Sequence, residues 1–125
     1  MIDHVSIPAR NLTESADAYE RVLGPLGLTR LVERERTVGF GKRYPEFWLN
    51  HRPALWPIPQ DSGHHVSLRA PDDAAVRAFH AAALSIGWKD AGAPSPRPAA
   101  MRTVYSSFVL DPDGNKIEAI TFPRE

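Results

Sequence analysis

Two histidines occupy matching places in the two halves of this 125-residue chain. His4 lies in the run Asp3-His4-Val5-Ser6-Ile7, and His65 lies in His64-His65-Val66-Ser67-Leu68, at an offset of 65 − 4 = 61 residues. Imidazole is a common ligand of transition metals and also transfers protons near neutral pH. The repeat therefore predicts a duplicated structural unit whose two histidines meet where the halves join.

Side-chain alternation indicates a third residue for the same site. Both histidines fall on the polar face of an expected strand, because alternate side chains of a strand point to opposite faces. In the last expected strand, Ile117 and Ala119 are apolar, which turns Glu118 to that polar face. Two imidazoles and a carboxylate suit one divalent metal ion (Zn, Fe, Mn, Ni or Co), and three protein ligands leave positions for water or substrate. We predict that His4, His65 and Glu118 bind such an ion.

Each half of the chain shows the order strand, helix, strand, strand, strand. Apolar residues recur at helical spacing after Asn11 and after Asp72, each of which is a plausible N-cap. These patterns predict a single α+β domain over 1–125, with module one at about 1–50, a connection at 51–62 and module two at about 63–125. Strands are expected at residues 2–8, 28–35, 37–41, 46–50, 63–70, 88–91, 103–110 and 116–122.

Two segments of the second half carry loop or turn signals. Pro94, Pro96 and Pro98 predict a mobile or extended loop over 92–100, and the sequence leaves open whether this loop closes as a lid. The run Asp-Pro-Asp-Gly-Asn at 111–115 predicts a hairpin turn with its glycine at positive φ.

The composition argues against several classes of function. The 15 basic and 15 acidic residues balance, which leaves no net charge to attract nucleic acid or an anionic membrane surface. The chain has no cysteine, which excludes disulfides, thiolate metal ligands and a cysteine nucleophile. No apolar run has the length of a membrane helix. We therefore expect a cytoplasmic protein with no nucleic-acid partner and no membrane partner.

The motifs resemble those of the vicinal oxygen chelate superfamily, which includes glyoxalase I, bleomycin-resistance proteins, fosfomycin-resistance enzymes and extradiol dioxygenases. The matching segments are 2–5, 19–28, 63–66 and 111–118, which together span nearly the whole chain. The resemblance implies two tandem βαβββ modules that form a half-open, curved mixed sheet around a central pocket, with the helices outside. It implies the ligands His4, His65 and Glu118, and a homodimer. The family's fourth ligand position falls on Trp48, whereas glyoxalase I has a carboxylate there.

Three hypotheses of function follow from this resemblance. The first is a metal-dependent enzyme, a lyase, isomerase or dioxygenase, that chelates a small oxygen-rich substrate and stabilises an enolate or oxyanion. The alternative is a metal-free ligand-binding protein of the bleomycin-resistance type, with Trp48 and Trp56 stacked on the ligand. The third, an extradiol-type dioxygenase, ranks lower because no second catalytic histidine is evident.

The candidate substrate contacts are three aromatic residues, Trp48, Trp56 and Tyr105. Trp48 faces away from its two neighbours in the strand, which makes it a pocket wall or a core residue. Loop packing and core packing are the competing explanations for Trp56 and Tyr105. His64 is adjacent to His65 and is expected to point to the opposite face of the strand.

Overall fold

The computed structural model describes residues 1–123, in which two βαβββ units follow one another. Module one contains β1 (Val5–Ala9), α1 (Leu12–Leu23), the short 3₁₀ helix η1 (Gly24–Leu26), β2 (Thr29–Glu33), β3 (Thr37–Gly41) and β4 (Pro45–His51). Module two contains β5 (Val66–Arg69), α2 (Asp73–Ser85), β6 (Lys89–Pro98), β7 (Thr103–Leu110) and β8 (Lys116–Thr121). The expected α+β fold of tandem modules is confirmed.

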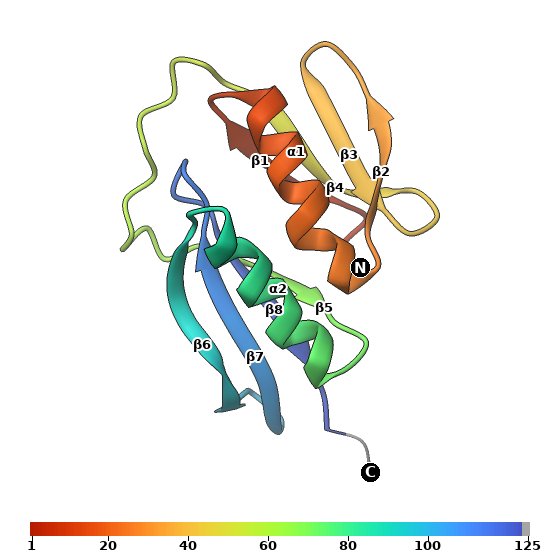
Figure 1. The fold of residues 1–125 in the computed structure, drawn as a ribbon, viewed down its shortest axis with the longest axis vertical. Coiled ribbons are helices and arrows are strands. Elements are labelled where there is room, and N and C mark those ends of the chain that lie inside the picture. Colours follow the sequence, from red (N-terminus) through yellow and green to blue (C-terminus); the bar gives the residue numbers. More distant parts are fainter. Residues whose placement is uncertain (124–125) are drawn as a thin grey trace.

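Each module folds into its own four-stranded mixed sheet, in the order β1-β4-β3-β2 and β5-β8-β7-β6. The first strand of each module pairs in parallel with the last strand, so the register of the two modules can be compared directly. Ser6 lies opposite Trp48 in module one, and Ser67 lies opposite Glu118 in module two. Figure 1 shows the two helices side by side on one side of the molecule, which leaves the other face of each sheet without a helix.

The helices begin at the expected N-caps. The Asn11 side chain accepts a hydrogen bond from the Glu14 N–H at 3.2 Å, and the Asp72 side chain accepts one from the Ala75 N–H at 2.8 Å. Such caps satisfy N–H groups that have no partner within the helix. Neither helix is long and apolar enough to span a membrane, within the residues that the structure describes.

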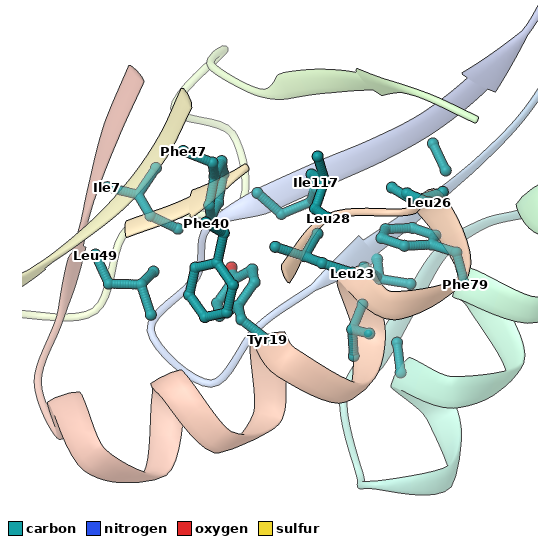
Figure 2. Packing of buried hydrophobic residues seen from close by; sticks show 14 of the residues in the cluster. Ile7, Tyr19, Leu23, Leu26, Leu28, Phe40, Phe47, Leu49, Phe79 and Ile117 are labelled. Carbon is teal, nitrogen blue, oxygen red and sulfur yellow. The ribbon is translucent and has the colours of Figure 1, made fainter. Parts of the chain in front are cut away.

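The apolar faces of both helices and both sheets pack together into one continuous hydrophobic core. Figure 2 shows side chains from the two modules interleaved within it. Tyr19 of α1 lies near the centre, with its ring centroid 5.3 Å from that of Phe47 in β4 and 4.7 Å from that of Trp88 before β6. Burial of apolar side chains is the main stabilising term in folding. Because this core is shared by the two modules, they are expected to fold and unfold as one unit.

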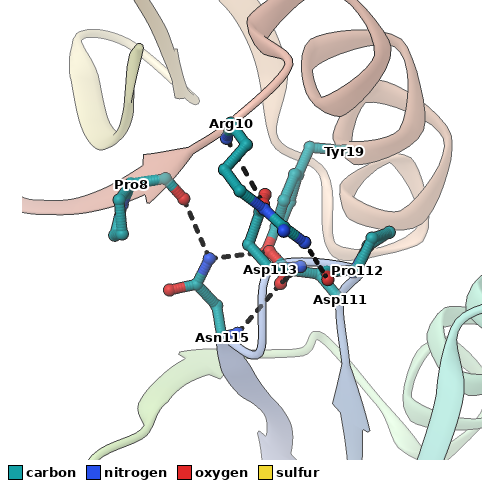
Figure 3. Close-up of polar contacts among 7 residues, drawn as sticks. All are labelled: Pro8, Arg10, Tyr19, Asp111, Pro112, Asp113 and Asn115. Atoms are coloured by element: carbon teal, nitrogen blue, oxygen red, sulfur yellow. Dashed lines mark hydrogen bonds and ion pairs between the residues drawn. The ribbon is translucent and has the colours of Figure 1, made fainter. Parts of the chain in front are cut away.

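The turn between β7 and β8 is more than a hairpin connection. The Asp111 carboxylate accepts hydrogen bonds from the Tyr19 hydroxyl at 2.6 Å, from Asn115 Nδ2 at 2.9 Å and from the N–H groups of Asp113 and Asn115 at 2.9 Å (Figure 3). Burial raises the pKa of Asp111, although the bonds from Tyr19 and Asn115 act in the opposite direction. Burial, followed by the nearby Asp111 carboxylate, raises the pKa of Tyr19 well above its ordinary value.

The same turn joins module two to the end of β1. Arg10 Nε donates to Asp113 Oδ1 at 2.7 Å, and Asn115 Nδ2 donates to the Pro8 carbonyl at 3.0 Å (Figure 3). Gly114 has φ 92°, which confirms the expected left-handed conformation, and its N–H donates to the Asp111 carbonyl at 3.1 Å. The turn therefore fixes the position of one module against the other.

The loop predicted for residues 92–100 is wrong, because most of this segment belongs to strand β6. Pro94, Pro96 and Pro98 lie in an edge strand that pairs with β7, with two shifts of register. An edge strand tolerates proline, since the missing N–H lies on the side that needs no partner or at a bulge. The prolines thus indicate an edge strand with irregular pairing. The segment is held in the sheet by its pairing with β7.

Candidate metal and ligand site

The structure brings together two of the three predicted metal ligands, His65 and Glu118. His65 immediately precedes β5, and Glu118 lies in the adjacent strand β8. His65 Nε2 is 3.2 Å from Glu118 Oε1, and this imidazole is the one side chain that hydrogen-bonds to Glu118 within residues 1–123. Glu118 is only 7% exposed, whereas the His65 side chain is 42% exposed. A nearly buried carboxylate is thus covered by a ring that solvent or another molecule can reach.

The separation of these two atoms fits a shared metal ion. Metal bonds of about 2.1 Å place adjacent ligand atoms roughly 3.0 Å apart at octahedral angles and roughly 3.4 Å apart at tetrahedral angles. The observed 3.2 Å between His65 Nε2 and Glu118 Oε1 lies between these two values. It is also an ordinary hydrogen-bond length, so the donor chemistry fits both a metal-bound and a metal-free form of the pair.

The third predicted ligand, His4, lies apart from this pair. It immediately precedes β1, so that the two repeat-related histidines occupy equivalent positions in their modules. Its side chain is 51% exposed, and its Nδ1 is 2.7 Å from Asp3 Oδ2. Within residues 1–123, no group of three His, Cys, Asp or Glu side chains is close enough to hold a metal ion. Within one chain, His4 and His65 therefore occupy repeat-related positions but do not lie at a common site.

Trp48 occupies the position in module one that Glu118 occupies in module two. Each lies opposite the serine that follows the corresponding histidine by two residues, Ser6 or Ser67. Trp48 is half-buried and faces away from the fully buried Phe47. A Cβ at Gly39 would lie 3.0 Å from two atoms of the Trp48 ring, so the absence of a side chain there makes room for the indole. An indole therefore lines the helix-free face of module one where module two has a carboxylate.

The other two predicted substrate contacts lie elsewhere. Trp56 is 87% exposed in the connection between the modules. Tyr105 packs against the buried cluster, and its hydroxyl accepts a hydrogen bond from Arg77 Nη1 of α2 at 3.5 Å. Tyr105 therefore lies on the helix-covered side of β7. His64, the neighbour of His65, is hydrogen-bonded to the Ser62 hydroxyl.

A cavity of about 520 Å³ lies along α1. It is bounded by this helix and by the turn that follows β7, with Arg10, Trp88 and Asp113 among its lining residues. Neither His65 nor Glu118 lines this cavity. The predicted ligands therefore lie outside this cavity, and of the pair it is the His65 ring that a second molecule can reach.

The residues that surround Glu118 were not among the predicted site residues. Phe108 of β7 lies directly opposite Glu118 of β8, and its ring centroid is 5.5 Å from that of His65. Lys116 Nζ is 4.9 Å from the centre of the Phe108 ring, and the Arg97 guanidinium carbon is 5.3 Å from it. Strand alternation was the available signal, since Lys116 and Glu118 are two residues apart and share a face.

Comparison with known proteins identifies the family. The model of the glyoxalase/bleomycin resistance protein/dioxygenase superfamily matches residues 1–119. A glyoxalase/bleomycin resistance protein from Albidiferax ferrireducens T118 superposes with a TM-score of 0.82 at 28% identity, covering 96% of this chain and 98% of the other. No match was found among curated proteins.

More distant structures share the fold. A glyoxalase/bleomycin resistance protein/dioxygenase from Alicyclobacillus acidocaldarius has a TM-score of 0.69 at 17% identity and covers 99% of this chain and 92% of its own. The fosfomycin resistance protein FosX from Listeria monocytogenes also has a TM-score of 0.69, at 10% identity, over 98% of this chain and 93% of its own. With the family model matching nearly all of the sequence, the chain belongs to the glyoxalase/bleomycin resistance protein/dioxygenase superfamily.

Proposed function

We propose that this chain is a metal-dependent enzyme of the vicinal oxygen chelate type that acts on a small oxygen-rich substrate. The observation that carries the proposal is the His65–Glu118 pair, an imidazole and a nearly buried carboxylate 3.2 Å apart on a sheet face without a helix. Buried carboxylates are rarely left with a single hydrogen-bond partner, because the loss of hydration must be compensated. A divalent cation between the two groups would supply that compensation.

The roles of the residues follow from their chemistry. His65 and Glu118 would hold the ion, which when bound polarises a substrate oxygen and stabilises an enolate or oxyanion. Phe108 packs against the His65 ring and limits its orientations, which keeps the imidazole directed toward Glu118. The low exposure of Glu118 excludes water from one side of the pair, which strengthens electrostatic interactions there.

We propose further that a homodimer completes the ligand set. His4 stands at the same point in module one as His65 in module two, and it is exposed. A second copy that docks its module one against module two would bring His4 of the partner subunit to His65 and Glu118. The twofold symmetry usual for homodimers then generates two equivalent sites. Trp48 from the same module would form an aromatic wall of each site.

Metal analysis of protein purified without a metal-binding tag tests this proposal. We expect about one divalent ion per chain in the wild type, and a loss of most of it in His65→Ala and Glu118→Gln, because each removes one of three ligands. His64→Ala is the matched control, since this neighbouring histidine is hydrogen-bonded to Ser62 and should leave metal content unchanged. Full metal content in both ligand variants would contradict the proposal.

The alternative function is metal-free ligand binding, as in the bleomycin-resistance type. Trp48 is the aromatic residue whose position suits it, because the indole lies half-buried on a helix-free sheet face. In that case a ligand would quench the Trp48 fluorescence equally in the presence and absence of a chelator. Quenching that disappears with the metal, and in Trp48→Phe, supports the enzyme.

A further inference from the structure

Positive charge gathers on the helix-free face of module two, although the chain as a whole is neutral. Ser107 identifies the face of this sheet that α2 covers, because its hydroxyl donates to the Val76 carbonyl of α2 at 3.3 Å. Strand register therefore places alternate residues of the module on the face away from α2. We define the helix-free face by these residues: His65, Ser67, Arg69, Ser95, Arg97, Val104, Ser106, Phe108, Leu110, Lys116, Glu118, Ile120 and Phe122.

Two aromatic rings on this face are each bordered by two cations. Besides Arg97 and Lys116 at Phe108, the guanidinium carbons of Arg69 and Arg102 lie 4.4 Å and 4.6 Å from the centre of the Phe122 ring. Cations interact favourably with aromatic faces, which accounts for their placement in the absence of a ligand. The arrangement sets three basic side chains of the defined face, and Arg102 from the turn before β7, against Glu118, the single acidic residue of that face.

Arg97 and Lys116 have hydrogen-bonding capacity to spare. Arg97 Nε donates to the Ser106 hydroxyl at 3.1 Å, and its Nη2 donates to the Ala93 carbonyl. These two bonds fix the side chain over Phe108 and leave the other guanidinium N–H groups available. The Lys116 ammonium donates no hydrogen bond, and neither cation lies within ion-pair distance of a carboxylate, within residues 1–123, although the Asp90 carboxylate interacts with Arg97 at longer range. Charged side chains are rarely buried without a partner, so both half-buried cations retain the capacity to bind an anion.

We propose that Arg97 and Lys116 bind an anionic group of the substrate, a carboxylate or a phosphoryl oxyanion, beside the His65–Glu118 pair. This inference rests on the proposed function, since one small molecule would present its anionic group to the cations and its chelating oxygens to the ion. An arginine held by its Nε and a mobile ammonium together offer several charge-assisted hydrogen bonds to an oxyanion. The substrate class is therefore a small anionic, oxygen-rich molecule.

The test uses metal-depleted protein, so that its result does not depend on the metal site. Methylphosphonate is titrated against isotopically labelled protein, with backbone amide shifts in β6, β7 and β8 as the readout and its neutral dimethyl ester as the control ligand. We expect the anion alone to shift these amides. Arg97→Gln/Lys116→Gln should weaken binding by at least about tenfold, because charge-assisted hydrogen bonds are lost.

Two further variants separate recognition from net charge and from folding. Arg21→Gln/Arg77→Gln removes the same charge from the exposed surfaces of α1 and α2, and should change the affinity less than about twofold, because exposed distant charges are screened. Arg97→Lys/Lys116→Arg keeps both charges and should bind more tightly than the Arg97→Gln/Lys116→Gln pair but more weakly than the wild type, because a lysine cannot make the bonds of Arg97 to Ser106 and Ala93. Equal weakening by the two glutamine pairs, or equal binding of the ester, would overturn the inference. Oxyanion binding by a protein that never takes up metal would refute the proposed function and leave this inference intact.

Discussion

The contact between the Tyr19 hydroxyl and Asp111 should couple the two modules energetically. The hydroxyl donates to Asp111 Oδ2 at 2.6 Å, and both residues are buried. A hydrogen bond to a charged group contributes about 1.5–3 kcal/mol, and the carboxylate would retain its other donors. Tyr19→Phe should therefore lower the free energy of unfolding by about 2 kcal/mol. Urea denaturation followed by tryptophan fluorescence measures this, since Trp88 lies against the Tyr19 ring.

A double-mutant cycle isolates this contact from the loss of packing. Asp111→Ala leaves four donors without their acceptor, so it should cost at least about 4 kcal/mol. In that background, Tyr19→Phe should cost almost nothing, because the hydroxyl has already lost its partner. The predicted coupling energy is about 2 kcal/mol. Equal costs of Tyr19→Phe in both backgrounds would refute the assignment.

Two other predictions concern the same joint. Because the folded-state pKa of Tyr19 is raised, its contribution to stability is complete below about pH 10 and is lost as pH rises through the folded value, at about 1.4 kcal/mol per pH unit. Alkaline urea titrations should show this slope in Tyr44→Phe, in which an exposed tyrosine is replaced, and a smaller slope in Tyr19→Phe. Gly114→Ala should cost at least about 2 kcal/mol, because φ is 92° and the new Cβ would lie 2.4 Å from the Ile58 carbonyl oxygen. Gly24→Ala, with no atom within 4 Å of its new Cβ, should change the free energy of unfolding by less than about 1 kcal/mol. Thermal melts of both variants measure this, and similar costs for the two would contradict the steric argument.

Local sequence signals predicted most of the fold because each has a local physical cause. The cap at Asn11, the cap at Asp72 and the positive φ of Gly114 depend on a few neighbouring atoms, and all are confirmed. The prolines at 94, 96 and 98 did not predict a strand, because their effect depends on whether the segment lies at a sheet edge, which only the tertiary structure decides. The first strand also begins at Val5, later than expected from alternation alone.

The candidate site was only partly accessible from the sequence for a similar reason. His65 and Glu118 share a sheet, so strand alternation was enough to bring them together. The bond from Tyr19 to Asp111 joins residues 92 positions apart in different modules, and no periodicity reports such a contact. The position of His4 depends on how the two modules meet, or on a second chain, and its role as a ligand stays a prediction.

In the proposed homodimer, His4 and the His65–Glu118 pair come from different chains to bind one ion. Mixing His4→Ala with His65→Ala protein, under conditions that allow subunits to exchange, tests this directly. Each mixed dimer would contain one intact site and one doubly altered site, so metal content should rise from near zero in either variant to about one quarter ion per chain in an equal mixture. A mixture that binds no more metal than its separate components would contradict the shared site.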